Sequence, residues 1–119
     1  MFQSWFRSKT QLVSSKVQQI SAFALYERMQ AGEALFFIDV RTPGEYEYDG
    51  HIVGSRLLPL AVLPHRIDEL PKGSTIVCIS RSGARSHTAA EQLLMKGFED
   101  VVNLSGGMIG WRHAGLPYQ

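Results

Sequence analysis

The feature that most constrains the fold is a short apolar run that passes directly into a polar loop. Residues 75–79 read Thr-Ile-Val-Cys-Ile, a β-branched and apolar segment that predicts a buried strand. Residues 80–86 follow at once as Ser-Arg-Ser-Gly-Ala-Arg-Ser, and a helical pattern of apolar positions then extends over residues 86–96. A strand, a tight loop and a helix in direct succession are typical of α/β proteins with a parallel sheet.

The remainder of the chain repeats this alternation of short apolar runs and helix-like segments. Because helical or irregular segments separate the strands, the order predicts an α/β fold, a three-layer sandwich with a mainly parallel central sheet. We expect further strands at residues 17–20, at 34–40, within 52–60 and at 101–104, and helices between Ser21 and Gly32, over 61–70 and over 109–113.

Length and composition favour one domain. The chain has 119 residues with 45% hydrophobic content, which suits a single core, since domains most often hold roughly 100–150 residues. We assign residues 17–119 to this domain and residues 1–16 to an N-terminal extension. The formal net charge of +1 creates no field that would hold a polyanion, so nucleic acid is not an expected partner.

The N-terminal extension carries three aromatic residues, Phe2, Trp5 and Phe6, close to basic ones. It has no apolar run long enough to span a bilayer. We expect the extension to fold against its own domain, without membrane contact; docking on a partner or on a membrane surface is the alternative.

Cys78 is the only cysteine, so no intrachain disulfide can form, and we expect a cytoplasmic location. A free cysteine inside an apolar strand is usually an inert core residue, and we do not expect it to act as a nucleophile. We expect neither a metal nor a cofactor, since no ligand spacing relates the histidines at positions 51, 65, 87 and 113.

The loop at residues 80–86 is the candidate site. Ligands of open α/β sheets bind beyond the carboxyl ends of the strands, where loop amides and the positive end of the next helix meet. Gly83 allows the loop to curl into an anion-binding nest, and Arg81 and Arg85 add positive charge. On composition alone, an ordinary polar loop with two solvated arginines explains the segment equally well.

Three blocks, in order along the chain, resemble the motifs of rhodanese domains. Together they cover about residues 17–119, and their combination is far more specific than any one of them. The blocks are residues 35–41 (Leu-Phe-Phe-Ile-Asp-Val-Arg) with 43–46, 50–52 and Gly54; residues 80–85 (Ser-Arg-Ser-Gly-Ala-Arg); and residues 104–108 (Leu-Ser-Gly-Gly-Met) with Trp111.

The resemblance implies a sulfurtransferase. In that family the loop begins with a cysteine whose thiolate accepts a sulfane sulfur as a persulfide and passes it on. The implied partners are a small sulfur-containing anion such as thiosulfate and a thiol or cyanide acceptor, with a protein acceptor also possible. Here the first loop position is Ser80, and a hydroxyl is neither a soft nucleophile nor able to form a stable persulfide.

The resemblance also assigns roles to individual residues. It places Ser80, in the position of the nucleophile, and Arg85 at the catalytic centre, and gives Asp39 and Arg41 a supporting role as an ion pair. A loop of this short length goes with sulfur transfer in the family, whereas related phosphatases have a loop one residue longer. The implied substrate-binding loop consists of Arg81, Ser82, Gly83, Ala84 and Ser86.

Two hypotheses follow. In the first, the chain is a sulfurtransferase whose cysteine has been replaced by Ser80, naturally or by design, and which is therefore disabled. In the second, it is a naturally inactive module that binds an anion or a partner protein through residues 80–86. The glycine, both arginines and the start of the helix are all retained around position 80, and we therefore favour the first hypothesis.

Overall fold

The computed structural model describes residue 13 and residues 17–119. Its centre is a five-stranded sheet in which every pairing is parallel. This confirms the predicted α/β fold with a parallel central sheet. In spatial order the strands are β1 (Gln18–Ile20), β5 (Val101–Leu104), β4 (Thr75–Ile79), β2 (Leu35–Asp39) and β3 (Arg56–Leu57).

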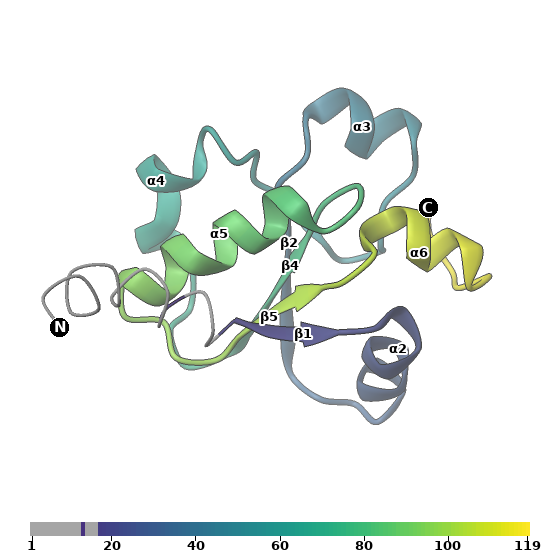
Figure 1. Ribbon diagram of the computed structural model, residues 1–119, viewed down its shortest axis with the longest axis horizontal. Coiled ribbons are helices and arrows are strands. Elements are labelled where there is room, and N and C mark those ends of the chain that lie inside the picture. The colour runs from purple at the N-terminus through teal and green to yellow at the C-terminus, as the bar shows by residue number, and fades with distance from the viewer. Residues whose placement is uncertain (1–12, 14–16) are drawn as a thin grey trace, which may run out of the picture.

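Helices cover both faces of the sheet and form the outer layers (Figure 1). One face packs against α4 (Leu63–Arg66), a 3-10 turn (Ile67–Glu69) and α5 (Ala84–Met95). The other face packs against α2 (Ala22–Gln30) and α6 (Gly107–His113). The short helix α3 (Pro43–Tyr48) follows β2 and lies beyond its carboxyl end.

Each face of the sheet has its own apolar cluster. Ile38 and Leu93 belong to the cluster under α5, and both are fully buried. Leu25 and Trp111 belong to the cluster under α2 and α6, where the Trp111 ring lies edge-on to Tyr26. The Trp111 indole also donates to the carbonyl of Pro117 at 2.8 Å, so the C-terminal segment is held against the domain.

The register of the central strands aligns the ends from which the functional loops emerge. Asp39, the last residue of β2, pairs with Ile79, the last residue of β4. Parallel strands with matched ends deliver their following segments to one edge of the sheet. The segment after β2 and the loop after β4 therefore lie side by side.

Two predicted elements are shorter in the structure than their expected ranges. The helical stretch expected over residues 61–70 is shorter and divided: α4 spans four residues and continues as a 3-10 turn, and Pro71 follows its end. The strand expected within residues 52–60 has only two residues, because Gly54 turns the chain at a φ of +89° and Pro59 follows.

Over the part of the chain that the structure describes, no helix has the length and apolar character needed to cross a membrane. The expectations for Phe2, Trp5 and Phe6 concern residues outside the described part.

Gly107, at the start of α6, is the glycine whose replacement should damage the fold most. A Cβ there would lie 2.4 Å from the carbonyl oxygen of Ser80, and its φ is +55°. We expect Gly107→Ala to lower the free energy of unfolding by about 2–4 kcal/mol, since left-handed strain and overpacking add. Urea denaturation measures this change.

Gly115 supplies the matched control, because its φ is +72° but no heavy atom lies within 4 Å of the point that a Cβ would occupy. Gly115→Ala should cost only the conformational strain, about 1 kcal/mol. Equal losses in the two variants would mean that the contact between Gly107 and the loop does not constrain the fold.

Candidate functional site

The side chain of Ser80 lies at the centre of the loop that joins β4 to α5. Its Oγ accepts hydrogen bonds from the backbone amides of Gly83 and Ser86, each at 3.1 Å. It also lies 2.7 Å from the Ser86 hydroxyl. Only 1% of Ser80 is exposed, so the loop curls around this one side-chain atom.

Gly83 makes this curl possible. Its φ is +104°, in the left-handed region that suits glycine, and it is the N-cap of α5. Its carbonyl accepts a hydrogen bond at 3.1 Å from the buried Asn103 side chain, which also donates to Gln19 at 2.9 Å. The role of Asn103 was not predicted from the sequence, although a polar residue in the apolar segment of β5 was a usable signal.

The turn before α6 supports the loop from a second side. The carbonyl of Ser80 accepts from the amide of Met108 at 2.9 Å, and the carbonyl of Arg81 accepts from the amide of Ile109 at 3.0 Å. The structure therefore brings the glycine turn at residues 106–107 against the backbone of the loop. This is the contact that leaves no room for a side chain at Gly107.

The outer side of the loop consists of Arg81, Ser82 and Ala84, all of which are exposed. Among the described residues, the amides of residues 81, 82, 84 and 85 have no hydrogen-bond acceptor. The amides of residues 84 and 85 lie in the first turn of α5, where the helix presents its positive end, and those of residues 81 and 82 lie in the loop just before it. The loop thus offers amide donors to an anion in addition to those that bind Ser80.

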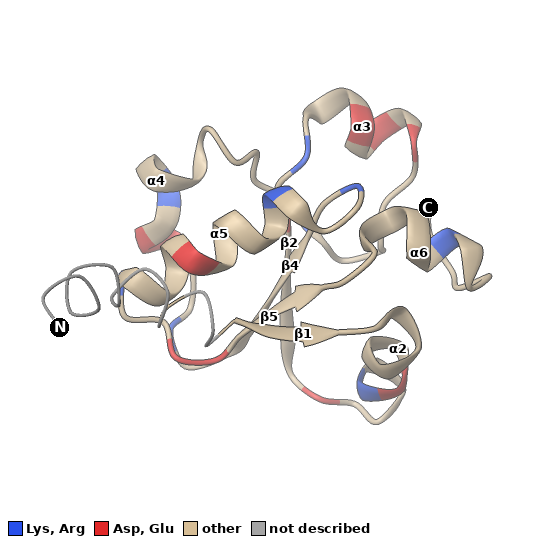
Figure 2. Ribbon diagram, in the orientation of Figure 1, with Lys and Arg blue, Asp and Glu red and all other residues tan. Residues whose placement is uncertain are grey.

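Arg85 forms a bidentate ion pair with Glu45 of α3. Both terminal nitrogens of Arg85 bind the carboxylate, each at 2.7 Å. The hydrogen bonds from Arg85 lower the pKa of Glu45 to about 2. Basic positions in the loop and at the start of α5, and acidic positions in α3, are coloured in Figure 2.

Glu45 was not assigned to the site from the sequence. The signal available was Thr42-x-x-Glu45, the pattern of a helix capping box, which the structure shows at the start of α3. That pattern predicts a helix start, but it cannot show that the same carboxylate reaches Arg85, 40 positions later in the chain.

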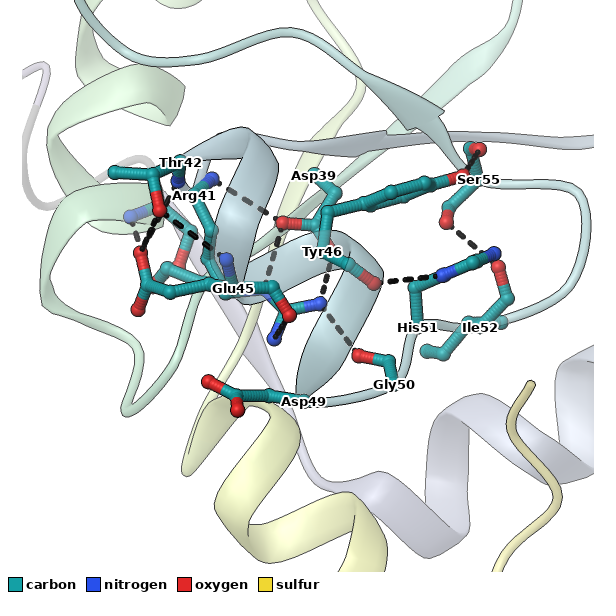
Figure 3. A network of polar contacts seen from close by, with 12 residues as sticks. Asp39, Arg41, Thr42, Glu45, Tyr46, Asp49, Gly50, His51, Ile52 and Ser55 are labelled. Carbon is teal, nitrogen blue, oxygen red and sulfur yellow. Dashed lines mark hydrogen bonds and ion pairs between the residues drawn. The ribbon is translucent and has the colours of Figure 1, made fainter.

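Asp39 and Arg41 form a second ion pair, which is almost fully buried. Arg41 Nε donates to Asp39 Oδ1 at 2.9 Å, and Arg41 Nη2 donates to Asp39 Oδ2 at 2.8 Å. Nη2 also donates to the carbonyl of Gly50 at 2.8 Å, so the pair ties the end of β2 to the segment after α3 (Figure 3). Arg41 braces the segment that carries Glu45 and does not reach the loop surface.

Cys78 lies inside β4, with no exposed surface. Its neighbours in the sheet are Ile38 and Asn103, and burial raises the pKa of its thiol. A buried, protonated thiol is a poor nucleophile. Cys78 therefore takes part in packing rather than in the chemistry of the loop.

The loop has hydrogen-bond donors that could bind and orient an anion, but no neighbouring base activates Ser80 as a nucleophile. Within the described part of the chain, its hydroxyl bonds only to the two amides and to the Ser86 hydroxyl, and no His, Asp, Glu or Lys side chain accepts its proton. No group of three His, Cys, Asp or Glu side chains there has the arrangement of a metal site.

Replacing Asp39 by asparagine tests the supporting pair. Asp39→Asn should lower the free energy of unfolding by about 3–5 kcal/mol, because it leaves the buried guanidinium of Arg41 without a counter-charge. Urea denaturation gives the value. Glu69→Gln, which removes the carboxylate from an exposed pair with Arg66, should have a much smaller effect; similar losses in both variants would contradict the role of the buried pair.

Comparison with known proteins identifies the family. The sequence matches the Rhodanese-like domain family over residues 21–114. It is 39% identical over 101 residues to a sulfurtransferase of Allochromatium vinosum, covering 85% of this chain and 94% of that protein. It is 35% identical to the putative sulfurtransferase YtwF of Bacillus subtilis, covering 86% and 97% of the two chains.

Other relatives are longer, and solved structures share the fold. The match to the putative sulfur carrier protein YrkF of B. subtilis, at 36% identity, covers 82% of this chain but only 52% of that protein. The crystal structure of a rhodanese-related protein from Thermoplasma volcanium has a TM-score of 0.75 at 29% identity, covering 86% of this chain and 97% of that one. The chain therefore belongs to the rhodanese-like domain family.

Proposed function

We propose that this domain has the architecture of a sulfurtransferase that carries sulfane sulfur as a persulfide at position 80, and that Ser80 disables this transfer. The observation that carries the proposal is the convergence of the amides of Gly83 and Ser86 on the side-chain atom of residue 80. A sulfur atom at that point would receive the same donors. Hydrogen bonds of this kind favour the charged form of a thiol, whose free pKa is about 8.5.

The chemistry proposed for a cysteine at position 80 has two steps. The thiolate attacks the outer sulfur of thiosulfate, the S–S bond of thiosulfate breaks, and sulfite leaves with the electron pair. An acceptor such as cyanide or a thiolate then attacks the terminal sulfur of the persulfide, and the cysteine thiolate is released. The amides of Gly83 and Ser86 and the Ser86 hydroxyl stabilise negative charge on the side chain of residue 80 in both steps.

Serine supports neither step. A hydroxyl is far less acidic than a thiol, no described side chain near Ser80 accepts its proton, and an oxygen atom cannot form a stable persulfide equivalent. Cys78 cannot take over, since it is buried in β4. With serine at position 80, the chain should thus bind a sulfur-containing anion without transferring sulfur.

The proposed partners are a small anion of the thiosulfate type and a thiophilic acceptor, either a small thiol, cyanide or a protein. The names of the relatives that are called sulfurtransferases support sulfur transfer at the level of the family. A reducing compartment such as the cytoplasm would suit a catalytic thiol.

A second candidate function is a module that binds an anion or a partner protein without any turnover. The free amides of residues 81, 82, 84 and 85, together with the exposed Arg81, favour it, because they do not depend on the residue at position 80. Both candidates predict anion binding at the loop. Only the first predicts that a cysteine at position 80 restores transfer.

Ser80→Cys distinguishes the two candidates. The native chain should not form thiocyanate from thiosulfate and cyanide, whereas Ser80→Cys should raise the rate by several orders of magnitude, because it supplies the missing nucleophile. Mass spectrometry should show that the variant gains one sulfur atom from thiosulfate and loses it to cyanide.

Two controls accompany this variant. Ser80→Ala should be inactive, and Cys78→Ser in the Ser80→Cys background should retain activity, since the thiol at position 78 is not exposed. Turnover by the native chain, or an inert Ser80→Cys variant with an intact loop, would reject sulfur transfer at position 80 and leave the binding module.

A further inference from the structure

The charges around the loop are more nearly balanced than its sequence suggests. Three arginines lie in or beside it, but Arg41 is neutralised by Asp39 and Arg85 is neutralised by Glu45. Among the described residues, Arg81 forms no ion pair with an acidic side chain. Of the two arginines in the loop sequence, Arg81 and Arg85, only Arg81 therefore adds an unpaired positive charge to the amide donors.

The position of Arg85 is strongly constrained by Glu45. Both terminal nitrogens of Arg85 are engaged by the two carboxylate oxygens. Glu45 Oε1 also accepts from the amide and the hydroxyl of Thr42, each at 3.1 Å. To contact an anion on the loop, Arg85 would have to break its ion pair with Glu45. The position of Glu45 is in turn fixed by its hydrogen bonds with Thr42 at the start of α3.

We propose that Glu45 lowers the affinity of the loop for doubly charged anions more than its affinity for singly charged anions. The proposal rests on the proposed function. It means that Glu45 shifts the balance towards a sulfur donor with a single negative charge, such as a persulfide anion, relative to dianionic thiosulfate. The carboxylate repels a bound anion in proportion to the charge of that anion. It also withholds the guanidinium of Arg85, whose second positive charge a dianion would use.

Glu45→Gln is a clean test of this proposal. Glutamine is the same size and can keep the capping box with Thr42, so α3 should still begin at the same residue. The substitution removes the negative charge and weakens the hold on Arg85. Glu47→Gln is the matched control, since Glu47 is an exposed carboxylate on the same helix.

Thiosulfate and methanethiosulfonate are suitable probes, because both have an outer sulfur atom on an oxidised sulfur centre and they differ by one negative charge. Binding is measured on the full chain with Ser80 in place, from the chemical shifts of the amides of residues 81–86, at constant ionic strength and neutral pH.

In Glu45→Gln the affinity should rise about threefold for methanethiosulfonate and about tenfold for thiosulfate, because the Coulomb energy scales with ligand charge. Glu47→Gln should change either affinity by less than about twofold, since exposed charges far from the ligand are screened. In the Ser80→Cys background, the same substitution should lower the KM for thiosulfate more than the KM for methanethiosulfonate.

The outcomes separate this proposal from the one on which it rests. If Glu45→Gln changes the two affinities by equal factors, or changes neither, charge discrimination by Glu45 is overturned while the loop remains an anion site. Failure of both anions to shift the loop amides in any variant would overturn the anion site itself. The binding of both anions to the native chain needs no variant, so the anion site itself is tested even if Glu45→Gln folds poorly.

Discussion

The arrangement of the site depends on one backbone constraint, the convergence of two amides on the side chain of residue 80. The left-handed conformation of Gly83 produces it, and the start of α5 supplies the amide of Ser86. The Asn103 side chain and the turn at residues 106–107 then hold the loop from behind. Because these supports are backbone geometry and packing, they do not require a particular atom at position 80.

Two ion pairs of different character surround this loop. The pair of Asp39 and Arg41 is buried and joins the end of β2 to the carbonyl of Gly50, so it positions the segment that carries α3. The pair of Glu45 and Arg85 is partly exposed and joins α3 to the start of α5. The first sets where α3 lies, and the second determines the charge that the loop presents to a ligand.

The strands and the loop could be predicted because their signals are local. The apolar run at residues 75–79 became β4 with the expected bounds, and the run at residues 34–40 became β2 to within one residue at each end. The helical stretch expected over 61–70 is shorter in the structure, since apolar spacing alone fixes neither its start at Leu63 nor its change to a 3-10 turn at Ile67. The roles of Asn103 and Glu45 could not be predicted, because their partners lie 20 and 40 positions away.

The sequence by itself determined the fold class, the order of the strands along the chain, and the loop with its serine at position 80, since each of these depends on residue type and on spacing over a few positions. Only the tertiary structure decided which charges neutralise one another and which amides remain free. The matched ends of β2 and β4 bring α3 against the start of α5, and this contact pairs Arg85 with Glu45. The distance between two charged side chains at the edge of a sheet depends on strand order and register in space. The order of residues along the chain does not specify that distance.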